Sequence, residues 1–267
     1  MNLKELTDKV LNGRQITKEE ALFLYGQPLL ELCGSADEIR RRFCANRFDI
    51  CTIINAKSGS CSENCRFCAQ SAYNHTCAAS YPLLSKEEIV SQARIDHEQG
   101  VLRYSIVTSG KRLSDEEVDA MCETVREIKE KVGILVCVSF GLLKEQQFRK
   151  LKEAGVTRVH NNLETSRRNF PNICTTHRYD DKVQAIRAAQ SAGLSVCSGG
   201  IMGLGETTED RIDMALTLRE LGILSVPVNM LNPIPGTPLE NNERLTKEEM
   251  QRIVAVYRFI LPKASIR

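Results

Sequence analysis

Three closely spaced cysteines are the residues of this chain whose type and spacing most clearly suggest chemistry. Cys61, Cys65 and Cys68 form a C-x3-C-x2-C triplet. A structural zinc site takes four protein ligands, and an electron-transfer iron–sulfur cluster normally takes four cysteines. Three thiolates from one short loop instead suit a [4Fe–4S] cluster in which one iron stays open to a small molecule. The triplet therefore predicts a reactive centre.

The bulk properties describe a chain with no preference for polyanions or membranes. Its 267 residues suffice for one large α/β domain, and 36 basic against 34 acidic residues give a net charge of +2. This balance predicts no nucleic-acid partner and no membrane partner. The first residues are charged and no run approaches the roughly 20 apolar residues of a membrane span, so we expect a cytoplasmic protein.

The chain has 11 cysteines, an odd number, and its first residues predict no signal peptide. Both features favour reduced thiols over a disulfide framework. Free cysteines often serve as small buried apolar residues. That role is expected for Cys33, Cys44, Cys51, Cys77 and Cys122.

Short apolar runs alternate with helical patterns along most of the chain. A helical stretch is predicted over residues 2–46, ahead of the first strand. Four helices are predicted to begin with capping boxes, in which Ser or Thr stands three positions before Glu. The boxes begin at Thr17, Ser85, Ser114 and Thr246. The runs that predict strands are residues 49–54, 102–107, 134–139, 156–163, 195–199, 225–230 and 264–267.

Strands that alternate with helices predict a parallel sheet, and right-handed crossovers favour a TIM-type (β/α) barrel. We expect one domain over residues 1–267, with a helical extension at 1–46 and the barrel at 47–267. Seven strands are predicted, one fewer than a closed barrel has. Either the final strand and helix are missing from this chain, or the barrel is open.

Polar residues recur at the carboxyl ends and in the interior of the predicted strands. In such barrels the working residues lie at the carboxyl ends of the strands. An unpaired polar side chain inside a barrel costs about 1–3 kcal/mol, so several that converge are hard to explain by accident. They are Ser105, Cys137, Asn162, Glu164, Cys197, Asn229 and Arg267.

The cysteine loop, with Phe67 directly before its last cysteine, resembles the signature of the radical S-adenosylmethionine (SAM) superfamily. There, three cysteines hold a [4Fe–4S] cluster whose fourth iron binds SAM. The cofactors supply hydrogen abstraction from unactivated carbon, which no side chain can perform. The competing interpretation is half of a zinc site, but no second cysteine pair with suitable spacing follows.

Four ordered motifs are similar to those of the biotin synthase family, from about residue 40 to the chain end. That family inserts sulfur between two saturated carbons of dethiobiotin, and the sulfur comes from an auxiliary iron–sulfur cluster. The resemblance also implies a flavodoxin- or ferredoxin-type reductant, iron–sulfur assembly machinery and a homodimer. The motifs cover residues 55–71, 160–166, 197–207 and 226–239.

The resemblance assigns roles to individual residues. Asn162 and Glu164 match positions that contact SAM, and the stretch from Gly199 through Ile201 to Gly203 resembles the segment that packs against adenine. Asn229 matches an asparagine that binds the ureido ring of the substrate, and Asn162 is also expected near the substrate.

Three of the four auxiliary ligands implied by the family are present, namely Cys137, Cys197 and Arg267, but Ser105 stands where the fourth should be a cysteine. A hydroxyl is a much poorer iron ligand than a thiolate. Ser105 could bind as an alkoxide, the chain could lack the cluster, or the cluster could be of a 4Fe type instead of [2Fe–2S], with another thiolate. Cys174 is the candidate for that thiolate.

Two other functions remain open from the sequence. One is a different radical SAM enzyme with a similar barrel, of the hydrogenase-maturation or methylornithine-synthase type. The other is a zinc-binding interaction module. His160 and His177 are expected to serve packing rather than catalysis.

Overall fold

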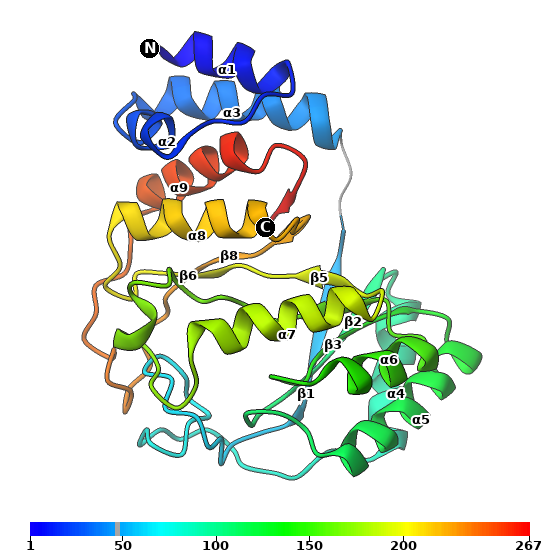
Figure 1. Cartoon of the computed structure of the whole chain (residues 1–267). Helices are drawn as coiled ribbons and strands as arrows, with labels where there is room; N and C mark the ends of the chain where they lie inside the picture. Colours follow the sequence, from blue (N-terminus) through cyan, green and yellow to red (C-terminus); the bar gives the residue numbers. More distant parts are fainter. Residues whose placement is uncertain (46–48) are drawn as a thin grey trace.

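The computed structural model describes residues 1–45 and 49–267. Three helices come first and pack over the carboxyl-terminal part of the chain, where α3 lies along α9 (Figure 1). The expected boundary between residues 46 and 47 lies outside the described residues. The helices are α1 (Leu3–Leu11), α2 (Lys18–Tyr25), α3 (Leu29–Cys44), α4 (Lys86–Glu98), α5 (Asp115–Lys131), α6 (Glu145–Ala154), α7 (Tyr179–Ser191), α8 (Thr208–Glu220), α9 (Lys247–Ile260) and the 3-10 turn η1 (Phe170–Asn172).

A parallel sheet of seven strands forms the centre, in the order β1-β2-β3-β4-β5-β7-β9. This confirms the predicted α/β barrel type, and each of the seven predicted runs contributes one strand to this sheet. A second sheet of two strands, β6 and β8, continues the inner wall. The strands are β1 (Cys51–Lys57), β2 (Arg103–Thr108), β3 (Leu135–Ser139), β4 (Arg158–His160), β5 (Ser195–Cys197), β6 (Gly200–Met202), β7 (Ser225–Val226), β8 (Val228–Met230) and β9 (Ser265–Ile266).

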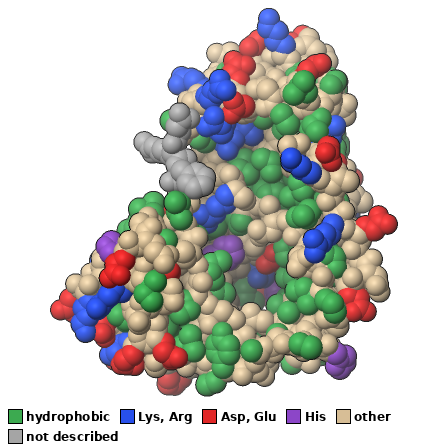
Figure 2. Space-filling model, turned by 180° about the vertical axis from the view of Figure 1, so that it is seen from behind, with side chains coloured by type: hydrophobic (Ala, Val, Ile, Leu, Met, Phe, Trp, Pro, Cys, Tyr) green, Lys and Arg blue, Asp and Glu red, His purple; other side chains and the backbone are tan. Residues whose placement is uncertain are grey.

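Within the described residues the sheet does not close. Strand β1 pairs only with β2, and β9 pairs only with β7, so these two strands are the edges. The molecule is hollowed on the face shown in Figure 2, where histidine and charged side chains are visible deep in the depression. The interior is therefore reachable from outside.

The capping boxes predicted from sequence are present at the starts of α2, α4 and α5, where the Ser or Thr hydroxyl accepts from the third helical N–H. At α9, Thr246 accepts from the Glu249 N–H at 3.1 Å. Such caps satisfy N–H groups that have no partner inside the helix. They explain why each helix begins directly after its loop.

Strand side chains alternate between the helices and the barrel interior, as a period of two requires. On β2, Tyr104 and Ile106 are fully buried, and the Tyr104 hydroxyl donates to the Ile89 carbonyl of α4 at 3.1 Å. The intervening Arg103 and Ser105 face the other way. Burial of aliphatic side chains between the strands and the helices stabilises the layer, by about 25 cal/mol for each Å² of apolar surface.

The sixth predicted strand, residues 225–230, is wrong as a single strand. Pro227 divides it into β7, which pairs with β5 and β9, and β8, which pairs with β6. Proline cannot donate a ladder hydrogen bond, so the chain leaves one sheet and joins the other there. This shift places Asn229 opposite Ile201.

Candidate functional site

The cysteine triplet lies on the loop that follows β1, and an unusual backbone turn introduces it. Gly59 has φ +73° and Ser60 has φ +48°, both in the left-handed region. A Cβ on Gly59 would lie 2.6 Å from the Ser80 side chain, so no other residue fits there without movement. The turn directs Cys61 away from the strand.

Backbone contacts then hold the loop in place. The Cys61 N–H donates to the Gln70 carbonyl at 3.0 Å, and the Gln70 side chain accepts from the Gly59 N–H at 3.1 Å. The Asn74 amide donates to the carbonyls of Cys65 (3.2 Å) and Cys68 (2.8 Å). One amide thus spans two of the three cysteines and fixes their spacing.

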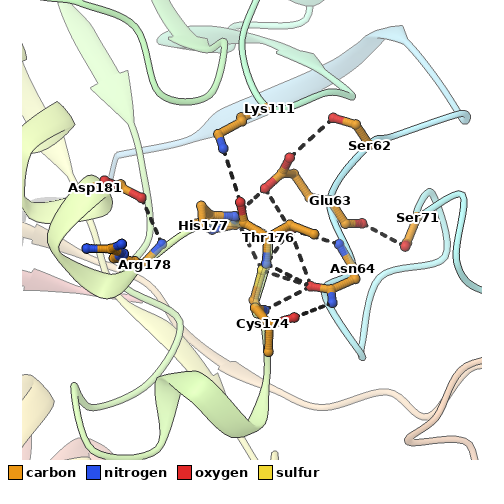
Figure 3. Close-up of polar contacts among 11 residues, drawn as sticks. Ser62, Glu63, Asn64, Ser71, Lys111, Cys174, Thr176, His177, Arg178 and Asp181 are labelled. Atoms are coloured by element: carbon orange, nitrogen blue, oxygen red, sulfur yellow. Dashed lines mark hydrogen bonds and ion pairs between the residues drawn. The ribbon is translucent and has the colours of Figure 1, made fainter.

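A second segment, residues 173–177, forms one wall of the triplet loop (Figure 3). The Asn64 side chain accepts from the N–H groups of Thr175 (2.9 Å) and Thr176 (3.3 Å). The Thr176 hydroxyl donates to Glu63 at 2.8 Å. The two segments lie more than 100 residues apart in sequence, and their contact was not predicted because no short motif indicates it.

The donor set fits an iron–sulfur cluster better than a single ion. All three thiols are partly buried, and burial raises the pKa of Cys68. In residues 1–45 and 49–267, the three sulfurs do not form a group with all mutual distances within 4.8 Å. Donors around one zinc ion would lie closer, about 3.8 Å apart for Zn–S bonds of about 2.3 Å. The loop therefore suits a larger group held by three thiolates.

The residues predicted to bind SAM gather beside this loop. Phe67 and Ile201 pack against one small apolar cluster, which joins the triplet loop to β6. The buried Asn162 accepts from the Gly199 N–H at 3.1 Å, and its amide donates to Glu164 at 3.4 Å. The apolar cluster consists of Ile173, Leu204, Leu231 and Leu239.

Glu164 has two unusual properties. Its φ is +70°, which is uncommon for a residue other than glycine, and burial raises the pKa of its carboxyl group. Strained backbone of this kind is concentrated at functional sites. The carboxylate is therefore held in an orientation that local preference alone would not select.

Two glycines allow β6 to approach its neighbours. A Cβ on Gly199 would lie 1.9 Å from the Pro227 carbonyl oxygen, and one on Gly200 would lie 2.4 Å from the Glu164 carbonyl oxygen. Only a residue without a side chain fits at either position. Gly203 has φ +99°, and its N–H donates to Glu206 at 2.8 Å.

Glu206 belongs to a buried ionic network that sequence reasoning missed. Its carboxylate accepts from Arg211 at 2.7 Å, and Arg211 also reaches Glu249 of α9 at 2.5 Å. Tyr25 of α2 contacts both Arg211 and Glu249. The network connects the β6–α8 loop with the amino-terminal helices.

A cavity of about 480 Å³ lies inside the barrel. This volume is in the usual range for small-molecule sites. Alternate residues of three strands line it, as expected for side chains that face inward. The exposed Asn229 also borders this cavity. Its lining consists of Asp49, Cys51, Ile53, Ser105, Val107, Cys137, Ser139, His160, Pro227, Asn229 and Arg267.

Two of the predicted auxiliary-cluster residues, Cys137 and Arg267, line this cavity, and Arg267 contacts the third, Cys197. Arg267 donates to the Cys197 sulfur at 3.1 Å, and His160 Nδ1 lies 3.4 Å from the same atom. Burial opposes ionisation of Cys197, but His160, Ser225 and Arg267 together outweigh it and lower the pKa to about 7. Burial raises the pKa of Cys137 to about 12. Ser105 lies opposite Cys137 in the register of β2 and β3, and its hydroxyl opposes this rise in the pKa.

The structure separates Cys174 from this group and adds Cys51 to it. Cys174 lies beside Cys65 and His177 at the triplet loop. Cys51 lies at the start of β1, two positions before Ile53, which pairs with Ser105. It therefore lines the same cavity as Cys137. The sequence could have identified Cys51 as a candidate, because it falls on an inward-facing position of the first predicted strand.

Charged residues surround the cavity at the start of the strands. The Oδ2 atom of Asp49 lies 3.2 Å from Arg158 Nη1 and 3.9 Å from Arg103 Nε, and both arginine side chains are largely buried. Together with Arg267 they place three cations near one carboxylate. The surplus positive charge suits a group that carries several thiolates.

None of the described helices is long and apolar enough to cross a membrane.

The fold and the thiol triplet define an α/β barrel of the radical SAM class. The sequence profile of the radical SAM superfamily matches residues 56–218, and that of the Biotin and Thiamin Synthesis associated domain matches residues 227–267. The chain is 58% identical over 267 residues to a biotin synthase of Brachyspira hyodysenteriae, covering 100% of this chain and 80% of the relative. It is 57% identical over 262 residues to a biotin synthase of Akkermansia muciniphila, covering 98% of this chain and 82% of the relative. The chain belongs to the biotin synthase family.

Solved structures show the same fold. Methylornithine synthase superposes with a TM-score of 0.86 at 25% identity, over 98% of this chain and 78% of that one. HydG, a maturase of the [FeFe]-hydrogenase, superposes with a TM-score of 0.83 at 24% sequence identity, over 98% of this chain and 61% of HydG. Membership of the family implies a [4Fe–4S] cluster with SAM and an auxiliary iron–sulfur cluster.

Proposed function

We propose that this chain catalyses the radical SAM-dependent insertion of sulfur into dethiobiotin to give biotin. One observation carries the proposal beyond family membership. The barrel that bears the triplet at its mouth also holds a second cavity with Cys137 at its wall and Cys197 within reach of Arg267. An enzyme with only the SAM cluster has no need of such thiols.

Cys61, Cys65 and Cys68 would hold the [4Fe–4S] cluster, with Phe67 packed behind the last of them. When bound, the cluster and SAM supply hydrogen abstraction from unactivated carbon. The chain's own residues position and shield the reactants. Glu164 would accept hydrogen bonds from the ribose of SAM, because an oriented carboxylate suits a diol.

Asn162 has a double role in this proposal. Its carbonyl oxygen already accepts from Gly199, so the bond fixes the close approach of β6 that adenine requires. Its amide nitrogen donates to Glu164 at 3.4 Å and would keep that carboxylate in place for SAM. Gly199, Ile201 and Gly203 would present backbone to the adenine ring.

The auxiliary cluster would be held by Cys51, Cys137 and Cys197, with Arg267 beside Cys197. Cys51 replaces the thiolate that Ser105 lacks, because both residues lie on inward positions of adjacent strands at the cavity. Ser105 would then lie opposite Cys137 in the strand register rather than bind iron. Cys174 is the less suitable candidate because it lies at the other cluster.

Asn229 would bind the ureido ring of dethiobiotin. An amide offers one acceptor and two donors, which complement the urea group. Its side chain is exposed to the cavity, next to the thiols from which sulfur would come. Substrate therefore would lie between the SAM site and the auxiliary cluster.

The reaction also needs partners. A flavodoxin- or ferredoxin-type protein would supply electrons, and iron–sulfur assembly machinery would rebuild the spent auxiliary cluster. We further propose a cytoplasmic homodimer and a single domain over residues 1–267. The sheet supports the single domain, since β7 and β9 pair within it.

Activity assays would test the reaction. Anaerobic protein reconstituted with iron and sulfide should form biotin from dethiobiotin, SAM and a reductant. Formation of 5′-deoxyadenosine without biotin would instead favour a reaction of the methylornithine-synthase or hydrogenase-maturation kind, whose fold this chain shares.

Mössbauer spectroscopy would test the ligands. Cys51→Ser should lose or alter the auxiliary signal and retain the SAM-cluster signal. Cys174→Ser should leave the auxiliary signal unchanged. The reverse pattern would exclude Cys51 and restore Cys174 as the third thiolate.

A further inference from the structure

We infer that the cluster-free chain holds one divalent metal ion, Zn²⁺ or Fe²⁺, between Cys65, Cys174 and His177. This site requires neither SAM nor dethiobiotin, so it goes beyond the proposed reaction. Two sulfurs and one imidazole are typical ligands of such borderline metals.

The geometry is that of a single-ion site. The three donor atoms all lie within 4.8 Å of one another, and no other group of three or more His, Cys, Asp or Glu does so in the part of the chain that the structure describes. The Cys174 sulfur lies 3.3 Å from His177 Nδ1. Donors around one tetrahedral zinc ion are about 3.5–3.8 Å apart, so small side-chain rotations suffice.

Burial and charge also favour a bound cation. Cys174 is 4% exposed and His177 is 7% exposed. The buried Glu63 carboxylate lies 2.5 Å from His177 Nδ1, and among the described residues no other basic group lies within 4.0 Å of it. A buried carboxylate beside two thiols is costly unless positive charge is supplied. A bound divalent ion would supply it.

Glu63 lies at the same ring nitrogen of His177 as the Cys174 sulfur, so with the ion on Nδ1 its carboxylate would bind the ion as a fourth ligand. The Thr176 hydroxyl donates to the same carboxylate at 2.8 Å (Figure 3). Asn64 holds the Cys174–His177 segment against the triplet loop, and its oxygen lies 3.4 Å from the Cys174 sulfur. The site is therefore preorganised by contacts that do not involve iron–sulfur chemistry.

Cys65 belongs both to this site and to the triplet. One thiolate cannot serve the single ion and the cluster in its normal position at the same time. The ion would therefore occupy the chain before cluster assembly and leave when the cluster forms. Binding releases the protons of any protonated thiols, without oxidation or reduction.

Cobalt titration of the cluster-free protein under anaerobic conditions tests this proposal. Co²⁺ bound by two thiolates should give sulfur-to-cobalt charge-transfer absorption and tetrahedral d–d bands. Cys174→Ser and His177→Gln should each weaken Co²⁺ binding by more than about 100-fold, since loss of an outer partner alone costs about 10–100-fold. Competition with Zn²⁺ would give the zinc affinity.

Matched variants separate this site from the triplet. Cys61→Ser and Cys68→Ser remove cluster ligands but leave the three proposed donors, so they should bind Co²⁺ like the wild type. Cys77→Ser removes an exposed thiol and serves as the control for nonspecific binding. Unchanged binding in both Cys174→Ser and His177→Gln, or loss of binding in Cys61→Ser and Cys68→Ser, would overturn the proposal. Circular dichroism of each variant checks that it is folded.

Discussion

Replacement of Gly199 by alanine is the sharpest test of how the SAM site is built. The added Cβ would meet the Pro227 carbonyl oxygen at 1.9 Å, and both atoms belong to the backbone or are fixed to it. No flexible side chain can move aside, so β6 or β8 must shift. Overpacking of this kind typically costs about 1–3 kcal/mol. A domain of this size should then melt about 2–12 °C lower, at about 2–4 °C for each kcal/mol.

The same shift should weaken SAM binding. Gly199 donates its N–H to Asn162 at 3.1 Å, so its movement displaces the residue that supports Glu164. A misplacement of about 1 Å can reduce a rate by about 100-fold. We therefore expect a loss of SAM affinity in isothermal titration of the reconstituted protein, together with slower formation of 5′-deoxyadenosine.

Gly34→Ala provides the matched control. Gly34 lies within α3, and a Cβ added there would meet nothing within 4 Å. Alanine there should be neutral or stabilising by up to about 1 kcal/mol, because glycine is a poor helix former. If Gly199→Ala melts and binds SAM like the wild type while Gly34→Ala behaves as expected, the close approach of β6 and β8 is not required.

Three further predictions concern the residues around the site. Burial opposes ionisation of Asp210, but hydrogen bonds led by that of Arg168 outweigh it and lower the pKa of its carboxyl group. The stabilisation by this carboxylate is present above the unfolded-state pKa of about 3.9 and is lost as the pH falls through the lower pKa of the folded state. Asp210→Asn should therefore make the free energy of unfolding in urea depend less on pH between pH 6 and 2. Arg211→Met should lower the free energy of unfolding in urea by about 3–5 kcal/mol, since Glu206 is only 2% exposed and loses its cation; a fall below 1 kcal/mol would contradict the network. Asn229→Ala should raise the KM for dethiobiotin with little change in melting temperature, because the side chain faces a cavity; an unchanged KM would remove it from the substrate site.

Much of the fold follows from local sequence patterns. Apolar runs of strand length and the boxes at Thr17, Ser85 and Ser114 predict the order of strands and helices, since caps and periodicity act over a few residues. Strand limits were less well predicted. Pro227 divides one expected strand between two sheets, because pairing partners and not local preference decide where a short strand belongs.

The sequence by itself determined the chemistry at the mouth of the barrel. Cys61, Cys65 and Cys68 lie on one loop, so their spacing along the chain already limits their separation in space. It also placed Cys137 and Cys197 on inward strand positions.

Only the tertiary structure decided which further thiols accompany each group. Cys51 and Cys137 share a cavity because of the strand register, whereas Cys174 lies beside Cys65 because two loops more than 100 residues apart in sequence contact each other. Such contacts depend on how strands and loops come together over long sequence separations. A motif of a few residues carries no information about them, so the position of Cys51 at the cavity and of Cys174 beside Cys65 became visible only in the assembled structure.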